Sequence, residues 1–309
     1  MSSDGPLHTA EPHRTGAASP LIWINGRSMA PDARHISALD RGFTLADGVF
    51  ETMRVYDGIV FHLEHHLRRL SASTSALGIP LRADVGATVG VAMSAAREAG
   101  MREAGVRITV SRGVGAPGVA PLPSTDPTVE PTVVVAVSAL PVFAPTIYTD
   151  GLAVRIASGR RNEHAMTAGL KTLAYADSVA ALAEARAAGA DDALFLDTEG
   201  HLSEATSSNA FICTDGVLAT PPLSCGALPG ITRATVLELA TELRLTVEAR
   251  PIQRDELFAA DELFLTSSLR AIAPVVSVNG RPIGRAKPGP ITRQLMDEYA
   301  SLVRRESAP

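Results

Sequence analysis

Alternating apolar and polar positions predict several strands in the first half of the chain. Residues 49–56 alternate in this way and end at the dipeptide Asp57-Gly58, which is typical of a hairpin turn. Residues 63–77 instead place apolar side chains at helical spacing. Further apolar runs predict strands at 20–26, 106–110 and 132–140. These elements together predict an α+β unit with a largely antiparallel sheet.

The second half mixes predicted strands with longer helical segments. We expect a strand at 152–157 and a hairpin that pairs 193–196 with the residues after Thr198-Glu199-Gly200. Apolar residues at helical spacing predict helices at 175–188, from Thr232 to Leu243, and at 292–304.

A short stretch bracketed by two prolines, residues 141–145, has no apolar period and marks a domain boundary. We therefore expect a small α+β domain over residues 20–141, a linker over 142–149 and a large domain over 150–309. Residues 1–19 contain no apolar core, and we expect them to form a disordered N-terminal extension.

Composition narrows the class of protein. The chain is 46% hydrophobic but only 4% aromatic, so its core must consist mainly of Ala, Val, Leu and Ile. Net charge is -5 without a Lys/Arg block, so neither a nucleic acid nor a membrane partner is expected. The only cysteines, Cys213 and Cys225, have neither metal-ligand nor disulfide spacing. We expect no metal site and a cytoplasmic location.

Lys171 is the first candidate for chemistry. It and Lys287 are the only lysines, and it lies in the apolar stretch 168–173 just before a predicted helix. Apolar surroundings disfavour the ammonium form, which lowers the pKa of the amine and frees it for Schiff-base chemistry. A lysine that extends from a strand end to solvent remains an equally good interpretation.

Other segments could bind an anion or a ring. Residues 228–233 lead into a predicted helix, whose free N–H groups favour an anion. The hydroxyl groups that follow residues 263–265 could also bind an anion. Each candidate also has an ordinary interpretation, as a helix cap, a solvated turn, a surface arginine or a packing tyrosine. His62, His65 and His66 are expected on a solvated helix face. The individual residues that could bind an anion or a ring are Arg69, Tyr175, Glu204, Thr232, Ser267 and Ser268.

The order of these motifs resembles the class IV aminotransferase family, the fold-type IV enzymes that use pyridoxal 5'-phosphate (PLP). This family includes branched-chain and D-amino acid aminotransferases and aminodeoxychorismate lyase. The resemblance runs from about Leu21 to the last predicted helix. It is carried by residues 40–43, 47–52, 66–70, 170–171, 204–209, 228–233 and 264–268.

The resemblance implies a two-domain α/β (α+β) fold, with a small α+β domain, a larger domain containing a barrel-like sheet, and PLP between them. Members are usually homodimers, and we expect at least a dimer here. Lys171 matches the lysine that forms an aldimine with PLP, and Glu204 the acid beside the pyridine nitrogen. Tyr175 matches a tyrosine near the ring oxygen, and Leu228 a leucine that packs on the ring. The matches to phosphate-binding residues are Arg69, Ile231, Thr232, Ser267 and Ser268.

The resemblance favours a transaminase that moves an amino group between a small amino acid or amine and a keto acid. The loop at 111–118 lacks the Arg and His of D-amino acid members, and Phe50 replaces their tyrosine. Residues 110–113 look like the lyase, which releases pyruvate and 4-aminobenzoate, although Ala174 stands where the lyase has an asparagine. The lyase stays open as an alternative, as does a PLP-binding homologue without efficient turnover.

The sequence also offers candidates for contacts with the substrate. Candidates for gripping a substrate carboxylate are Arg27, Arg54 and Arg112, although each also suits a surface or structural role. An apolar pocket of Phe43, Leu45 and Phe50 would favour an apolar or aromatic substrate side chain.

Overall fold

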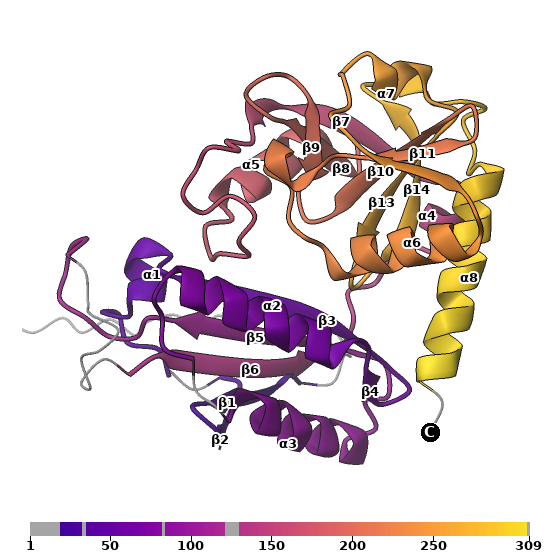
Figure 1. Cartoon of the computed structure of the whole chain (residues 1–309). Coiled ribbons are helices and arrows are strands. Elements are labelled where there is room, and N and C mark those ends of the chain that lie inside the picture. Colours follow the sequence, from indigo (N-terminus) through magenta and orange to yellow (C-terminus); the bar gives the residue numbers. More distant parts are fainter. Residues whose placement is uncertain (1–18, 33–34, 82–83, 121–129, 308–309) are drawn as a thin grey trace, which may run out of the picture.

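The computed structural model describes residues 19–32, 35–81, 84–120 and 130–307. Within these ranges the chain forms two sheets, the first from residues before 139 and the second from residues after 151 (Figure 1). Most of the predicted N-terminal extension, residues 1–18, lies outside the described residues. No helix in the described ranges is long and apolar enough to cross a membrane.

The first sheet has six strands in the order β2-β1-β6-β5-β3-β4, and every neighbouring pair is antiparallel. This confirms the predicted antiparallel sheet. Asp57 and Gly58 form the turn between β3 and β4 with positive φ angles of 48° and 81°. The strands are β1 Leu21–Ile24, β2 Arg27–Met29, β3 Gly48–Tyr56, β4 Ile59–Val60, β5 Ala104–Ser111 and β6 Thr132–Ser138.

One face of this sheet is covered by two helices, α2 Leu63–Ala76 and α3 Val85–Glu98. Val49, Met53 and Val55 of β3 point into the core beneath them, because alternate residues of a strand share a face. The intervening residues, such as Phe50, point to the opposite face. A short helix, α1 Arg41–Leu45, follows the N-cap Asp40.

The second sheet is mixed, in the order β12-β11-β10-β13-β14-β7-β8-β9, with β15 paired to β14. Its parallel pairs are β11 with β12, β14 with β7 and β7 with β8. The strands are β7 Leu152–Arg160, β8 Asp192–Leu196, β9 Leu202–Ala205, β10 Asn209–Thr214, β11 Val217–Thr220, β12 Thr246–Ala249, β13 Glu262–Ser267, β14 Ala271–Val278 and β15 Arg281–Pro282.

This sheet curls so that its two ends meet. The N–H of Leu202 in β9 donates to the carbonyl of Ile252, just after β12, at 2.8 Å, and His201 forms a bridge with Gln253. Because β9 and β12 are opposite ends of the strand order, these contacts confirm the barrel-like sheet that the resemblance implies. Its interior is filled by aliphatic side chains such as Leu194, Ile212 and Leu263.

The helices of the second half include three of the predicted ones, α5 Ala176–Ala187, α6 Ile231–Glu242 and α8 Pro290–Glu306. Both α6 and α8 pack against the second sheet in a cluster that includes Phe264. The remaining turns are α4 Thr146–Thr149, η1 Leu223–Cys225 and α7 Glu256–Ala259.

The segment after β7 returns to the first sheet. The N–H of Phe50 donates to the carbonyl of Lys171 at 2.9 Å, and the N–H of Leu173 donates to the carbonyl of Gly48 at 3.0 Å. Thr172 thereby forms a bridge with Val49 of β3. The sheet membership of the strands supports our proposal of domains over 20–141 and 150–309, with 142–149 as the linker.

Candidate active site

A cavity of about 830 Å³ lies between the two halves of the chain. This volume is within the usual range for sites of small ligands and cofactors, about 300–1,000 Å³. Both halves contribute to its walls. Residues singled out in the sequence that line it are Phe50, Arg69, Lys171, Tyr175, Glu204, Leu228, Ile231, Thr232, Ser267 and Ser268.

Lys171 lies between two aromatic rings. Its Nζ is 4.4 Å from the ring centroid of Phe50 and 3.2 Å from the hydroxyl of Tyr175, and the two rings pack edge to face. Burial, reinforced by the positive charge of Arg69, lowers the pKa of Lys171 to about 8. Glu51 and Glu204 oppose this change without cancelling it. The lysine therefore faces the cavity, which excludes the alternative of a surface lysine.

Arg69 of α2 is held in place by the buried carboxylate of Glu51. Its Nε and Nη2 donate to the two carboxylate oxygens of Glu51 at 2.7 and 2.8 Å, and its Nη1 donates to the carbonyl of Pro229 at 2.8 Å. His66 also bonds Glu51, at 2.7 Å. Burial raises the pKa of Glu51, but the hydrogen bonds from Arg69 and His66 outweigh it and lower that pKa to about 2. The guanidinium is thus fixed beside the start of α6.

The prediction of a solvated histidine face is wrong for His66. This side chain is buried and is the second partner of Glu51. Burial also lowers the pKa of His62 to about 4. Helical spacing alone could not reveal this, because the partner of His66 comes from a strand fifteen residues earlier.

Glu204 lies at the end of β9, inside the cavity. Its Oε2 accepts a hydrogen bond from the N–H of Leu228 at 2.9 Å, and its Oε1 lies 3.2 Å from Nη2 of Arg161. Burial raises the pKa of Glu204, and Arg161 works against this change. The carboxylate is therefore tied both to the segment before α6 and to a cation.

The N-terminus of α6 opens on the cavity through Gly230, Ile231 and Thr232. No side chain caps this end, so the first N–H groups of the helix are free to bind an anion. A Cβ at Gly230 would overlap the side chain of Asn209, which donates to the carbonyl of Leu228 at 2.8 Å. The close approach at this turn therefore requires glycine.

Hydroxyl groups face the same region from the end of β13. Ser267 and Ser268 line the cavity, and so does Thr266, whose buried Oγ1 has no hydrogen-bond partner among the described residues. A buried hydroxyl without a partner is costly, and an anion in the cavity would offer it one. Cations, free N–H groups and hydroxyls thus gather at one end of the cavity.

Four of the proposed substrate residues do not line this cavity. Phe43 and Leu45 are exposed on the short helix α1. Arg112 bonds Asp47 and the carbonyls of Leu77 and Gly78, and Arg54 donates to the carbonyl of Leu269 at 2.8 Å. A role for these four in substrate binding stays a prediction. Arg27 is exposed on β2.

Sequence reasoning missed Arg107 of β5. Its guanidinium stacks over Phe50, 3.8 Å from the ring centroid, and it lines the cavity near Lys171. It has no carboxylate partner among the described residues. The signal was available, because Arg107 is the only charged residue within the apolar run 106–110. Its place in the cavity depended on the pairing of β5 with β3.

Comparisons with known proteins agree with this fold. A family model described as amino-transferase class IV matches residues 48–278. A putative branched-chain-amino-acid aminotransferase of Methanocaldococcus jannaschii is 35% identical, over 91% of this chain and 96% of its own length. The chain therefore belongs to the class IV aminotransferase family, which confirms the resemblance.

Two solved structures are similar over nearly the whole chain. The branched-chain amino acid aminotransferase of Escherichia coli has a TM-score of 0.86 and 27% identity, covering 92% of this chain and 95% of that chain. The 4-amino-4-deoxychorismate lyase of Pseudomonas aeruginosa has a TM-score of 0.78 and 31% identity, covering 92% and 98%. The expected two-part fold is thereby confirmed.

The cavity fits the cofactor of this family, PLP. One amine with a lowered pKa, one buried carboxylate and an anion-binding end are the groups that an aldehyde, a pyridine nitrogen and a phosphate require. The unpartnered hydroxyl of Thr266 marks the end at which a phosphate would supply an acceptor.

Proposed function

We propose that this protein is a PLP-dependent transaminase that carries its cofactor on Lys171. Its substrates are an amino donor, such as a small amino acid, and a keto acid. The observation that carries this proposal is the amine of Lys171, which lies between Phe50 and Tyr175 and faces a cavity shared with Glu204. Aminotransferase names among its relatives support the same reaction.

PLP, when bound, supplies an aldehyde that condenses with amino groups and a ring that delocalises the electron pair at the substrate Cα. Lys171 would act as the general acid and base that takes the proton from the substrate Cα and returns it to the former aldehyde carbon, on the other side of the substrate nitrogen. A pKa of about 8 suits both directions near neutral pH. Tyr175, whose burial raises its own pKa to about 12, stays protonated and can donate.

Other residues hold and orient the cofactor. Glu204 would hold the pyridine nitrogen and favour its protonated form, while Leu228 would pack on the ring. Arg69 keeps two N–H groups that neither Glu51 nor Pro229 uses, and these can reach a phosphate beside α6. Further phosphate contacts come from Ile231, Thr232, Ser267 and Ser268.

Substrate selection follows from the wall formed by the first sheet. Phe50 offers an apolar surface, and Arg107 above it offers a cation without a carboxylate partner among the described residues. We propose that Arg107 binds a carboxylate of the amino acid or the keto acid. A hydrogen bond to a charged group contributes about 1.5–3 kcal/mol.

The lyase remains a second candidate. The solved lyase structure has 31% identity to this chain, slightly more than the aminotransferase structure at 27%. The same lysine and carboxylate would serve it, because both reactions begin by removing a proton from a substrate bound through nitrogen. The reaction outcome, and not the cofactor site, separates these two activities.

We also propose a cytoplasmic homodimer. Both cysteines are buried and free, as in a reducing compartment. Exposed apolar side chains lie on α1, where Phe43 is 75% exposed, and on the loop after β5, where Val119 is 84% exposed. Val114 of this loop forms a bridge with Asp40, just before α1. Such a surface suits an isologous contact between two copies.

The test mixes the purified holoenzyme with candidate amines and follows both the absorbance of the cofactor and the products. A transaminase converts the cofactor to its pyridoxamine form with each accepted amino acid, and a keto acid reverses the change. Release of pyruvate and 4-aminobenzoate from aminodeoxychorismate would instead establish the lyase. A cofactor band that no amine alters would contradict both and indicate a binding protein.

A further inference from the structure

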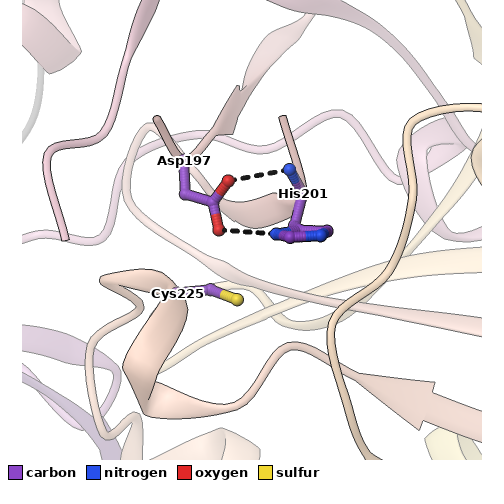
Figure 2. A group of neighbouring side chains, drawn as sticks. All are labelled: Asp197, His201 and Cys225. Atoms are coloured by element: carbon purple, nitrogen blue, oxygen red, sulfur yellow. Dashed lines mark hydrogen bonds and ion pairs between the residues drawn. The ribbon is translucent and has the colours of Figure 1, made fainter. Parts of the chain in front are cut away.

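Three side chains with metal-binding atoms meet outside the lining of the cavity. Asp197 and His201 close the turn between β8 and β9, and Cys225 ends η1. One ligand atom from each lies within 4.8 Å of the other two. Figure 2 shows the Cys225 thiol near the Asp197 carboxylate and the His201 ring. We propose that Asp197, His201 and Cys225 bind a zinc ion.

The turn preforms two of the ligands. The N–H of Asp197 donates to the carbonyl of His201, and the N–H of His201 donates to Oδ1 of Asp197, both at 2.7 Å. Oδ2 is left facing Nδ1 of His201 at 3.2 Å. Around a tetrahedral zinc with bonds of about 2.0–2.1 Å, an oxygen and a nitrogen ligand stand about 3.3 Å apart. The ion would take the place of the proton that this pair now shares.

The ligand types select the metal. A thiolate with an imidazole favours zinc over Mg²⁺ and Ca²⁺, which prefer oxygen ligands. Asp197 and Cys225 are buried, and the His201 side chain is 16% exposed, so the ion has a route from solvent. The carboxylate of Glu199 lies 3.6 Å from Nδ1 of His201 and is 70% exposed, so it can move to become the fourth ligand.

The position of this cluster gives the ion a structural consequence. β9 begins next to His201 and contains Glu204. Cys225 lies three residues before Leu228, whose N–H donates to Glu204. A zinc ion would join the hairpin to the segment before α6 outside the cavity. This inference does not depend on the proposed reaction.

Without a metal, the same contacts make an Asp–His ion pair beside a buried thiol. A zinc site and a metal-free Asp–His pair differ in the number of zinc ions bound per chain, so zinc binding to the holoenzyme decides between them. After dialysis against a chelator, we expect equilibrium dialysis to give one zinc per chain, and zinc to raise the melting temperature.

Matched variants locate the site. Losing an outer partner of a metal costs about 10–100-fold in affinity, so losing a ligand by Cys225→Ser or His201→Asn is expected to cost at least about 100-fold. Cys213→Ser changes the other buried cysteine, and His164→Asn changes a histidine whose side chain is 75% exposed. Both control variants are expected to bind zinc as the unaltered chain does.

Cobalt adds a spectroscopic signature. Co²⁺ bound to the unaltered holoenzyme should give a thiolate charge-transfer absorbance in a difference spectrum against Cys225→Ser. Absence of stoichiometric zinc, or zinc binding by the Cys225→Ser and His201→Asn variants as tight as that of the unaltered chain, would overturn the proposal. If Cys225→Ser does not fold, His201→Asn against His164→Asn decides alone.

Discussion

Glu51 binds two side chains at once in the core of the first half, and this determines where Arg69 points. The carboxylate is fully buried, whereas the arginine side chain is 11% exposed. Burial also lowers the pKa of His66, so this histidine stays neutral at pH 7 and donates a hydrogen bond to Glu51. Among the described residues, Arg69 is therefore the charged side chain that hydrogen-bonds Glu51 directly.

Replacing Glu51 by Gln should lower both stability and cofactor affinity. Breaking a buried ion pair costs about 3 kcal/mol, because the remaining charge is uncompensated. Urea unfolding of the apoprotein at pH 7 measures this loss. Glu103→Gln is the control, since Glu103 forms an exposed pair with Arg54 at 3.5 Å and should cost less than about 1 kcal/mol.

The same pair predicts a pH dependence. The pKa of Glu51 is about 2 in the folded protein and 4.5 in an unperturbed carboxyl group. The stabilisation is therefore fully present above pH 4.5 and is lost as the pH falls toward 2. The difference in unfolding free energy between the unaltered chain and Glu51→Gln should shrink over this range. A constant difference would show that packing, and not charge, explains the loss.

Arg107 gives a prediction about substrate binding. Arg107→Leu keeps the contact with Phe50 but removes the cation, so KM for carboxylate substrates should rise about 10- to 100-fold. Arg27→Leu removes an exposed arginine on β2 and should leave KM unchanged. Steady-state kinetics is measured with an amino acid and with an amine that lacks a carboxylate. This comparison separates loss of carboxylate binding from a general effect on the site. Equal effects of Arg107→Leu on both substrates would contradict this role.

At the scale of elements, the N-terminus of α6 depends on one glycine. Gly230→Ala would push Asn209 away and displace the first turn, so PLP affinity should fall at least about tenfold, measured by fluorescence titration of the apoprotein. Gly90→Ala is the control. It lies within α3 with open space around it, and should stabilise the fold by about 0.5–1 kcal/mol. An unaltered PLP affinity in Gly230→Ala would refute the helix as the phosphate site.

Element prediction succeeded where apolar spacing was regular. The hairpin at Asp57-Gly58 and the helices α2, α5, α6 and α8 were predicted close to their observed bounds. The helix α3 was missed, although Val85, Val89 and Met93 recur on its buried face. Its two interior glycines lower helix propensity, and packing against the first sheet outweighs this cost.

The site was predictable only through the order of its motifs. Lys171 and Glu204 stood in segments whose local sequence also suited a surface lysine and a turn acid. Their meeting depends on residues 171–173 pairing with β3, more than a hundred residues earlier in the chain. Long-range pairing of this kind carries no local sequence signal, which is also why Arg107 and the buried His66 were missed.

At the scale of the whole molecule, the cavity joins the two halves of the chain. PLP would contact Arg69 in the first half and Glu204 and Thr232 in the second. A ligand that binds only the folded state adds about 2.7 kcal/mol of stability at 100 times its Kd. We therefore expect PLP to raise the melting temperature of both halves together in one calorimetric transition. Two transitions, only one of which responds to PLP, would place the cofactor within a single half.

The central claim is that Lys171 holds the cofactor, and the chain offers its own control. Lys287, the only other lysine, is exposed and distant in sequence. Borohydride reduction of the holoenzyme, followed by peptide mass spectrometry, should place the phosphopyridoxyl mass on Lys171 and leave Lys287 unmodified. Labelling of apoprotein with added PLP should rise with pH through a midpoint near 8 and level off above it, as the pKa of Lys171 requires. A holoenzyme whose Lys171 stays unmodified after reduction would contradict the account.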